Sequence, residues 1–186
     1  MRKVNAILGP ALIVLLLIHA ISGALQLYGF LPGGNTIRSM LSWLLAGCTA
    51  FHAVIGIVLT VQTLRACKRS GRAYFRGNER FWIARLSGFA MLFLILYHIL
   101  IFTEPAGEVF RLQAFGWVQT AAHILLVLAL GVHLITNIRP LFMGLGIENR
   151  TFLRDILIVL SVVLLVCAAA FIYYYLRWNV LWRYGT

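Results

Sequence analysis

Acidic residues are scarce in this sequence: the chain of 186 residues has only five Asp and Glu against sixteen Lys and Arg. Each acidic residue lies between the long apolar runs or at the end of one; they are Glu79, Glu104, Glu108, Glu148 and Asp155. A proton-coupled transporter usually places a carboxylate or a lysine in the middle of the membrane. The absence of such a residue argues against that class of function.

Cysteine is also scarce, and its spacing excludes two common roles. Cys48, Cys67 and Cys167 are the only cysteines, and no two of them form a CxxC motif. A disulfide framework or a zinc site is therefore not expected. Zinc and copper sites would also favour cysteine or a carboxylate beside histidine. We interpret the three cysteines as ordinary packing residues.

Charged residues are few, whereas long apolar runs are abundant. Hydrophobic residues make up 62% of the chain and charged residues 11%, against about 45–50% and about 25% in soluble domains. A segment of about 20 apolar residues is long enough to cross a bilayer as a helix. Five segments qualify, at about 5–28, 40–64, 82–103, 117–138 and 152–178. We therefore predict one all-α integral membrane domain over residues 1–186, a bundle of five transmembrane helices.

The basic residues follow the connections between these segments and predict an orientation. A net charge of +11 could indicate nucleic-acid binding, but twelve of the sixteen basic residues fall on one side of the predicted bundle. They are Arg2, Lys3, Arg65, Lys68, Arg69, Arg72, Arg76, Arg80, Arg85, Arg139, Arg150 and Arg154. Because positive loops stay in the cytoplasm, we expect a cytoplasmic N-terminus, an outside C-terminus and no nucleic-acid partner. The expected location is the cytoplasmic (inner) membrane, crossed several times.

All five histidines lie inside the apolar segments, in four of the five; they are His19, His52, His98, His123 and His133. Polar residues inside a membrane are costly and usually functional, although a single one can be a neutral imidazole bonded to a neighbouring helix. Neutral imidazoles from different helices suit axial ligation of haem iron. Two histidines per iron fill both axial positions, which favours electron transfer over oxygen binding.

The positions of the histidines along their helices limit which two of them could bind the same iron. Gly23 and Gly56 stand four residues after His19 and His52 and so share their helix faces. They leave room for a flat macrocycle, although small residues also mediate helix packing in membranes. The helical rise places His19 and His98 at a similar depth toward the outer side, with His52 near mid-membrane. His123 and His133 are ten residues apart and cannot both bind the iron that His52 would bind, so the partner of His52 stays open at this point.

Two stretches of the sequence also resemble a known protein family. The stretch 51–98 begins FHAVIG, continues through a basic loop containing Tyr74 and Phe75, and ends with RLSG and a histidine ten residues later. It resembles the five-helix, two-haem cytochrome b membrane subunit of succinate dehydrogenase and fumarate reductase. HLITNIRPLFMGLGI at 133–147 resembles the family's fourth histidine and the polar stretch after it. The resemblance covers most of residues 12–147.

The resemblance implies a set of ligands and a longer fourth helix. His52 and His133 would hold one b-type haem nearer the cytoplasm, and His19 and His98 would hold a second nearer the outside. His123 is then an extra histidine, with a structural or quinone-side role. The fourth helix would continue past Arg139, through Pro140, to about residue 145.

The resemblance also implies partners. A flavoprotein subunit and an iron–sulfur subunit would dock on loop 65–85 and residues 139–154, and electrons would pass between their clusters, the haems and a membrane quinone (menaquinone or ubiquinone). No residue here suits the dicarboxylate, and no catalytic residue is assigned. Gly131 and LPGGNTIR stand where some members have a carboxylate, so this sequence offers no carboxylate there for a proton route. Weak candidates for quinone contacts are Gln26, Tyr28, Arg38, Ser42, Asn137 and Arg139.

Two other functions stay open on the sequence. A two-haem cytochrome b of another membrane dehydrogenase or reductase would also need buried histidines, although several of those place two ligands on one helix. A small transporter or sensor without haem would be colourless when purified. The sequence does not decide between succinate oxidation and fumarate reduction, and it does not identify the quinone.

Overall fold

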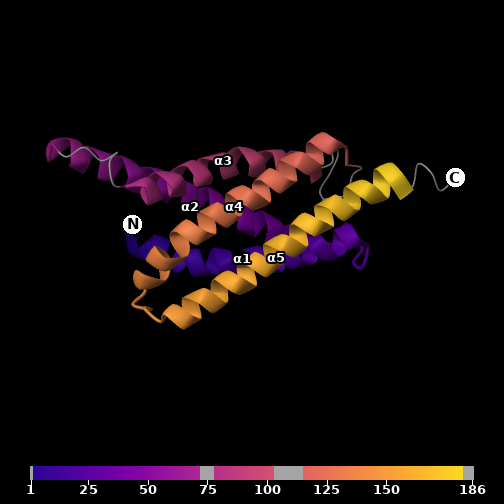
Figure 1. Ribbon diagram of the computed structural model, residues 1–186, viewed down its shortest axis with the longest axis horizontal. Coiled ribbons are helices and arrows are strands. Elements are labelled where there is room, and N and C mark those ends of the chain that lie inside the picture. The colour runs from indigo at the N-terminus through magenta and orange to yellow at the C-terminus, as the bar shows by residue number, and fades with distance from the viewer. Residues whose placement is uncertain (1, 72–77, 103–114, 182–186) are drawn as a thin grey trace.

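The computed structural model describes residues 2–71, 78–102 and 115–181, and these residues form an all-helical bundle (Figure 1). Its helices are α1 (Arg2–Tyr28), α2 (Thr36–Arg69), α3 (Glu79–Phe102), α4 (Trp117–Met143) and α5 (Arg150–Leu176), and a π-helical turn, Arg177–Leu181, continues α5. All five are long and apolar enough to cross a membrane. The five predicted spans are therefore confirmed as helices of a multi-pass membrane protein.

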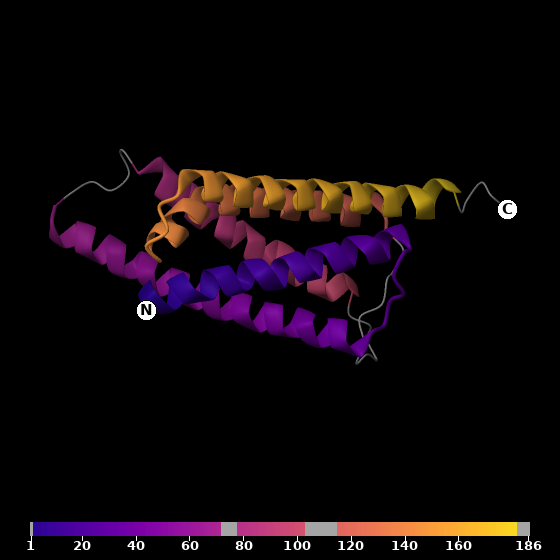
Figure 2. The same ribbon diagram turned by 90° about the horizontal axis from the view of Figure 1, so that it is seen from below.

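Polar residues extend helix α2 beyond both of its predicted ends. The Asn35 side chain accepts a hydrogen bond from the Arg38 backbone N–H (3.1 Å), so α2 begins at Thr36 rather than at residue 40. At its other end α2 continues to Arg69. Its 34 residues span about 51 Å at 1.5 Å per residue, which exceeds the hydrocarbon core of about 30 Å. The last turns of α2 accordingly project beyond the other helices (Figure 2).

Helix α4 passes through Pro140 and ends at Met143. Proline has no N–H to donate to the carbonyl four residues earlier, which here belongs to Thr136. The guanidinium of Arg80 donates to that carbonyl (3.3 Å) and to the carbonyl of Ile135 (3.4 Å). A neighbouring side chain therefore replaces the missing hydrogen bond, which is how membrane helices tolerate proline.

The helices pack closely on one side of the bundle and leave a space on the other. Close backbone contacts join α1 to α2 and α5, α5 to α4, and α4 to α3. Helix α5 contributes to both buried apolar clusters, one around Phe115 and Phe171 and one around Ile138 and Leu160. In α2, by contrast, only Ser39 and Ile55 are buried. Helix α5 therefore supports the bundle, and the open region lies between α1, α2, α3 and α4.

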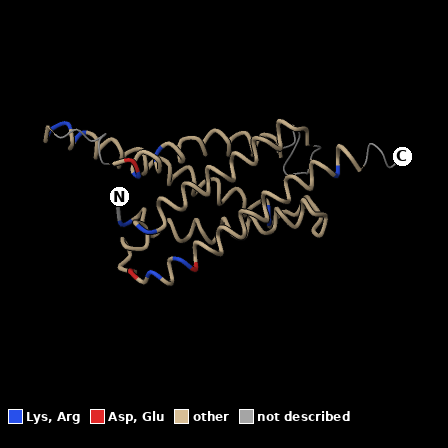
Figure 3. Tube along the Cα trace, viewed as in Figure 1, with Lys and Arg blue, Asp and Glu red and all other residues tan. Residues whose placement is uncertain are grey.

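Basic residues gather at one end of the bundle, the end where the N-terminus lies (Figure 3). We call it the basic end; its described residues outside α1 include Arg65, Lys68, Arg69, Arg80, Arg139, Arg150 and Arg154. The described basic residues toward the opposite end, where the C-terminal helix finishes, are Arg38 and Arg177. Of the twelve basic residues used to predict orientation, Arg72 and Arg76 lie outside the described ranges, as do Glu104, Glu108, Tyr74 and Phe75.

Candidate functional site

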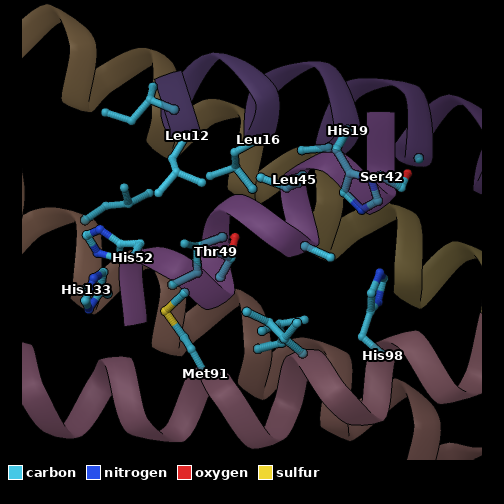
Figure 4. A pocket seen from close by; sticks show the side chains of 18 of the residues that line it. Leu12, Leu16, His19, Ser42, Leu45, Thr49, His52, Met91, His98 and His133 are labelled. Carbon is cyan, nitrogen blue, oxygen red and sulfur yellow. Dashed lines mark hydrogen bonds between the residues drawn. The ribbon is translucent and has the colours of Figure 1, made fainter. Parts of the chain in front are cut away.

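A cavity of about 650 Å³ occupies the open region of the bundle and is lined by His19, His52, His98 and His133. Its volume falls within the roughly 300–1,000 Å³ of typical ligand and cofactor pockets. Most of the lining is apolar, including Leu residues of α1 and α2 (Figure 4). The described lining contains Arg38 and Arg85 and no Asp or Glu. Such a cavity suits a large apolar ligand that carries negative charge.

The four histidines lie in two opposed pairs. His52 on α2 faces His133 on α4, with ring centroids 6.4 Å apart and ring planes at 88°. His19 on α1 faces His98 on α3, with centroids 5.8 Å apart and planes at 78°. Figure 4 shows the two pairs at opposite ends of the cavity. These are the pairings that the family resemblance implies; whether the histidines bind iron stays a prediction.

The spacing of the His52–His133 pair matches the geometry of two imidazoles on opposite sides of one metal ion, and the spacing of the His19–His98 pair is slightly shorter. Metal–imidazole bonds are about 2.0–2.1 Å long, which with the ring radius separates two such centroids by roughly 6–6.5 Å. Within residues 2–71, 78–102 and 115–181, no three His, Cys, Asp or Glu side chains group into a metal site. Two donors per site are too few for the four ligands of structural zinc but fill both axial positions of haem iron.

Hydrogen bonds determine which ring nitrogen of His133 is free. Its Nδ1 lies 3.2 Å from the Ala84 carbonyl oxygen and 3.3 Å from Ser87 Oγ. A carbonyl oxygen only accepts, so Nδ1–H donates and Nε2 of the neutral ring keeps its lone pair. Metal-bound histidines usually donate their other N–H in this way.

Hydrogen bonds also determine which ring nitrogen of His19 is free. The Ser42 hydroxyl donates to the Arg38 carbonyl (2.9 Å), and its oxygen therefore accepts from Nδ1–H of His19 (3.0 Å). Nε2 of His19 is again left with a lone pair. His52 differs from both, because its Nδ1 is buried without a hydrogen-bond partner among the described residues.

His123 does not line the cavity. It is 1% exposed, and its Nε2 lies 3.1 Å from Nδ1 of His98. The sequence predicts no contact for His123 and leaves its role open between structural and quinone-side. His98 on α3 and His123 on α4 come from helices that pack against each other, and their matching depth is the one sequence signal that could have linked them.

The glycines that follow His19 and His52 face the cavity. A Cβ atom at Gly23 would meet nothing within 4 Å, and one at Gly56 would meet only the Arg85 guanidinium at 3.7 Å. Both glycines line the cavity, so the alternative that Gly23 serves close helix packing does not hold. Gly88 differs: its Cβ would lie 3.1 Å from Cε1 of His133, so glycine there lets that imidazole lie against α3.

The open space beside Gly23 allows a direct test of whether a haem occupies it. We expect Gly23→Leu to fill part of the cavity beside His19 and to lower the haem content from two per chain toward one. Gly47→Leu is the matched control, because Gly47 is exposed on α2, does not line the cavity and would also place a Cβ with nothing within 4 Å. The haem-to-protein ratio of both purified variants measures the effect. Equal ratios in the two variants would show that the space beside Gly23 is not a haem site.

The weak quinone candidates divide between the cavity and the surface. Gln26, Arg38, Ser42 and Asn137 line the cavity. Tyr28 does not; its ring packs against Tyr173, with centroids 5.2 Å apart. Arg139 is exposed at the basic end.

Comparisons with protein-family models, with curated proteins and with solved structures found no match to this chain. The resemblance to the succinate dehydrogenase and fumarate reductase family therefore stays a prediction from the residues.

Proposed function

We propose that this chain is a two-haem cytochrome b that carries electrons within the membrane. The observation that supports it best is the presence of two opposed imidazole pairs, spaced 5.8 and 6.4 Å between centroids, inside one cavity. A transporter or sensor has no evident need for two such pairs.

His52 and His133 would hold one b-type haem, and His19 and His98 the other. When bound, haem iron supplies a reversible one-electron carrier whose potential depends on its ligands and surroundings. Hydrogen bonds to Ser42, and to Ala84 and Ser87, orient the imidazoles of His19 and His133 and keep their Nε2 atoms free of protons. The apolar walls exclude water, and Arg38 and Arg85 balance negative charge on a bound group.

We further propose that the chain is the membrane anchor of a succinate dehydrogenase or fumarate reductase in the cytoplasmic (inner) membrane. Flavoprotein and iron–sulfur subunits would dock at the basic end, on the projecting turns of α2 and on residues 139–154. This surface is strongly positive and exposed at Arg65, Lys68 and Arg69. By the positive-inside rule it faces the cytoplasm, which puts the C-terminus outside. Electrons would pass between the iron–sulfur subunit and a membrane quinone through this chain.

The family assignment is tested by purifying the tagged chain from its own membranes in mild detergent. We expect a flavoprotein and an iron–sulfur protein to co-purify, and added succinate to change the haem absorbance in the reduced direction. Haem without those subunits and without a response to succinate would instead identify a cytochrome b of another dehydrogenase or reductase. A colourless preparation that retains all its partners would support a transporter or sensor.

A further inference from the structure

The hydrogen bonds of His123 fix its proton positions. Nδ1 of His123 lies 2.6 Å from the backbone carbonyl oxygen of Gln119, one turn earlier on α4. A carbonyl oxygen has no proton to give, so Nδ1 of His123 must be the donor. In a neutral imidazole with a proton on Nδ1, Nε2 carries a lone pair and accepts hydrogen bonds.

The surroundings of His123 favour this neutral form. The ring is 1% exposed and lies among aromatic rings, with centroids 4.6 Å from Phe171, 5.0 Å from Phe115 and 5.6 Å from Phe102. A charge buried in apolar surroundings without a counter-charge is costly. Nε2 of His123 is therefore an acceptor, held in place by rings from α3, α5 and the segment before α4.

The acceptor of His123 faces His98. Nε2 of His123 is 3.1 Å from Nδ1 of His98, so Nδ1–H of His98 donates across this contact. That leaves Nε2 of His98 without a proton. The backbone carbonyl of Gln119 thus determines, through two imidazoles in series, which nitrogen of His98 is available to a ligand.

We infer that His123 is a positioning residue for the His19–His98 site: it accepts a hydrogen bond from Nδ1–H of His98 and so fixes the tautomer and ring orientation of that ligand. The inference rests on the proposed function, because it assigns His98 to a haem. Two of the other paired histidines donate to different groups. Nδ1–H of His19 donates to a hydroxyl, and Nδ1–H of His133 donates to a backbone carbonyl and a hydroxyl. An imidazole acceptor makes His98 a more basic ligand than it would be unbonded.

Two substitutions separate this role from simple packing. His123→Leu still fills the space among the surrounding aromatic rings but removes the hydrogen-bond acceptor. His123→Gln keeps an acceptor, because the side-chain oxygen of glutamine can accept a hydrogen bond from Nδ1–H of His98. The readout is the midpoint potential of each haem in the purified full-length protein, with any partner subunits still bound. The haem that is absent from a His19→Ala variant identifies the signal of the His19–His98 site.

In His123→Leu we expect the potential of the His19–His98 haem to shift upward, because a less basic ligand stabilises ferric iron less well. We expect that haem to dissociate on the order of ten- to a hundredfold more readily, as with other lost partners of metal-bound histidines. The His52–His133 haem should keep its potential. His123→Gln should restore wild-type behaviour at both sites.

Unchanged potentials in His123→Leu would overturn the inference, as would equal shifts at both haems. If His123→Leu retains no haem, His123→Gln decides: wild-type potentials support the hydrogen bond, and loss of the His19–His98 haem there too contradicts it. A wild-type protein without haem would contradict the proposed function itself. If the wild-type protein contains two haems and substituting His123 leaves both midpoint potentials unchanged, only this inference is contradicted.

Discussion

His52→Ala will lower the haem content from two per chain to one, and His133→Ala will do the same. The two imidazoles face each other across one end of the cavity, so losing either would remove one of the two side chains proposed to hold the same haem. The His19–His98 pair is built from α1 and α3 and does not depend on that contact. The haem that remains should therefore keep its absorbance and its potential. The haem-to-protein ratio of the purified variants measures the change.

Gly47→Leu is the control for a substitution in a membrane-spanning helix, because Gly47 is exposed on α2 and does not line the cavity. We expect this variant to keep two haems per chain. An unchanged ratio in both His52→Ala and His133→Ala would remove the proposed pairing. Loss of both haems in every variant, the control included, would indicate instead that the bundle had failed to fold.

Reversing charge on the projecting end of α2 will release the soluble subunits. The triple variant Arg65→Glu, Lys68→Glu and Arg69→Glu changes three exposed residues and replaces attraction to an acidic partner surface by repulsion. Surface charges act over about 8–10 Å at physiological salt, so the effect requires direct apposition. We expect loss of most of the co-purifying flavoprotein and iron–sulfur subunits, measured by stain or mass spectrometry against the tagged chain.

The matched control is Arg65→Lys with Arg69→Lys, which keeps the charge at the same positions and should keep the complex intact. Haem content distinguishes lost docking from altered membrane insertion, because we expect a correctly inserted triple variant to bind two haems per chain. A triple variant that co-purifies with its partners in wild-type amounts would show that this surface does not dock them.

The fold was predictable from hydropathy because each helix carries its own apolar signal. Hydropathy locates all five spans, but it misplaces their ends where polar residues continue a helix. Helix α2 begins at Thr36 because Asn35 caps it, and an Asn before a helical run is a signal that was available. Its extension to Arg69 was missed because an average of hydropathy follows the lipid-facing part of a helix and ignores its polar ends.

The site was only partly accessible to sequence reasoning. The residues alone left His123 and His133 as rival partners for His52, because spacing gives a depth and a rotation but no distance between helices. The link from Gln119 through His123 to His98 depends on side-chain directions of two packed helices, which no local pattern encodes. The same holds for Arg80, whose bonds to α4 beside Pro140 join residues far apart in the chain.

The most direct test of the account is the haem-to-protein ratio of the wild-type chain, purified in mild detergent and assayed as its pyridine haemochrome. Two opposed imidazole pairs in one cavity predict two b-type haems per chain. A helical, correctly inserted protein that contains no porphyrin would contradict the account.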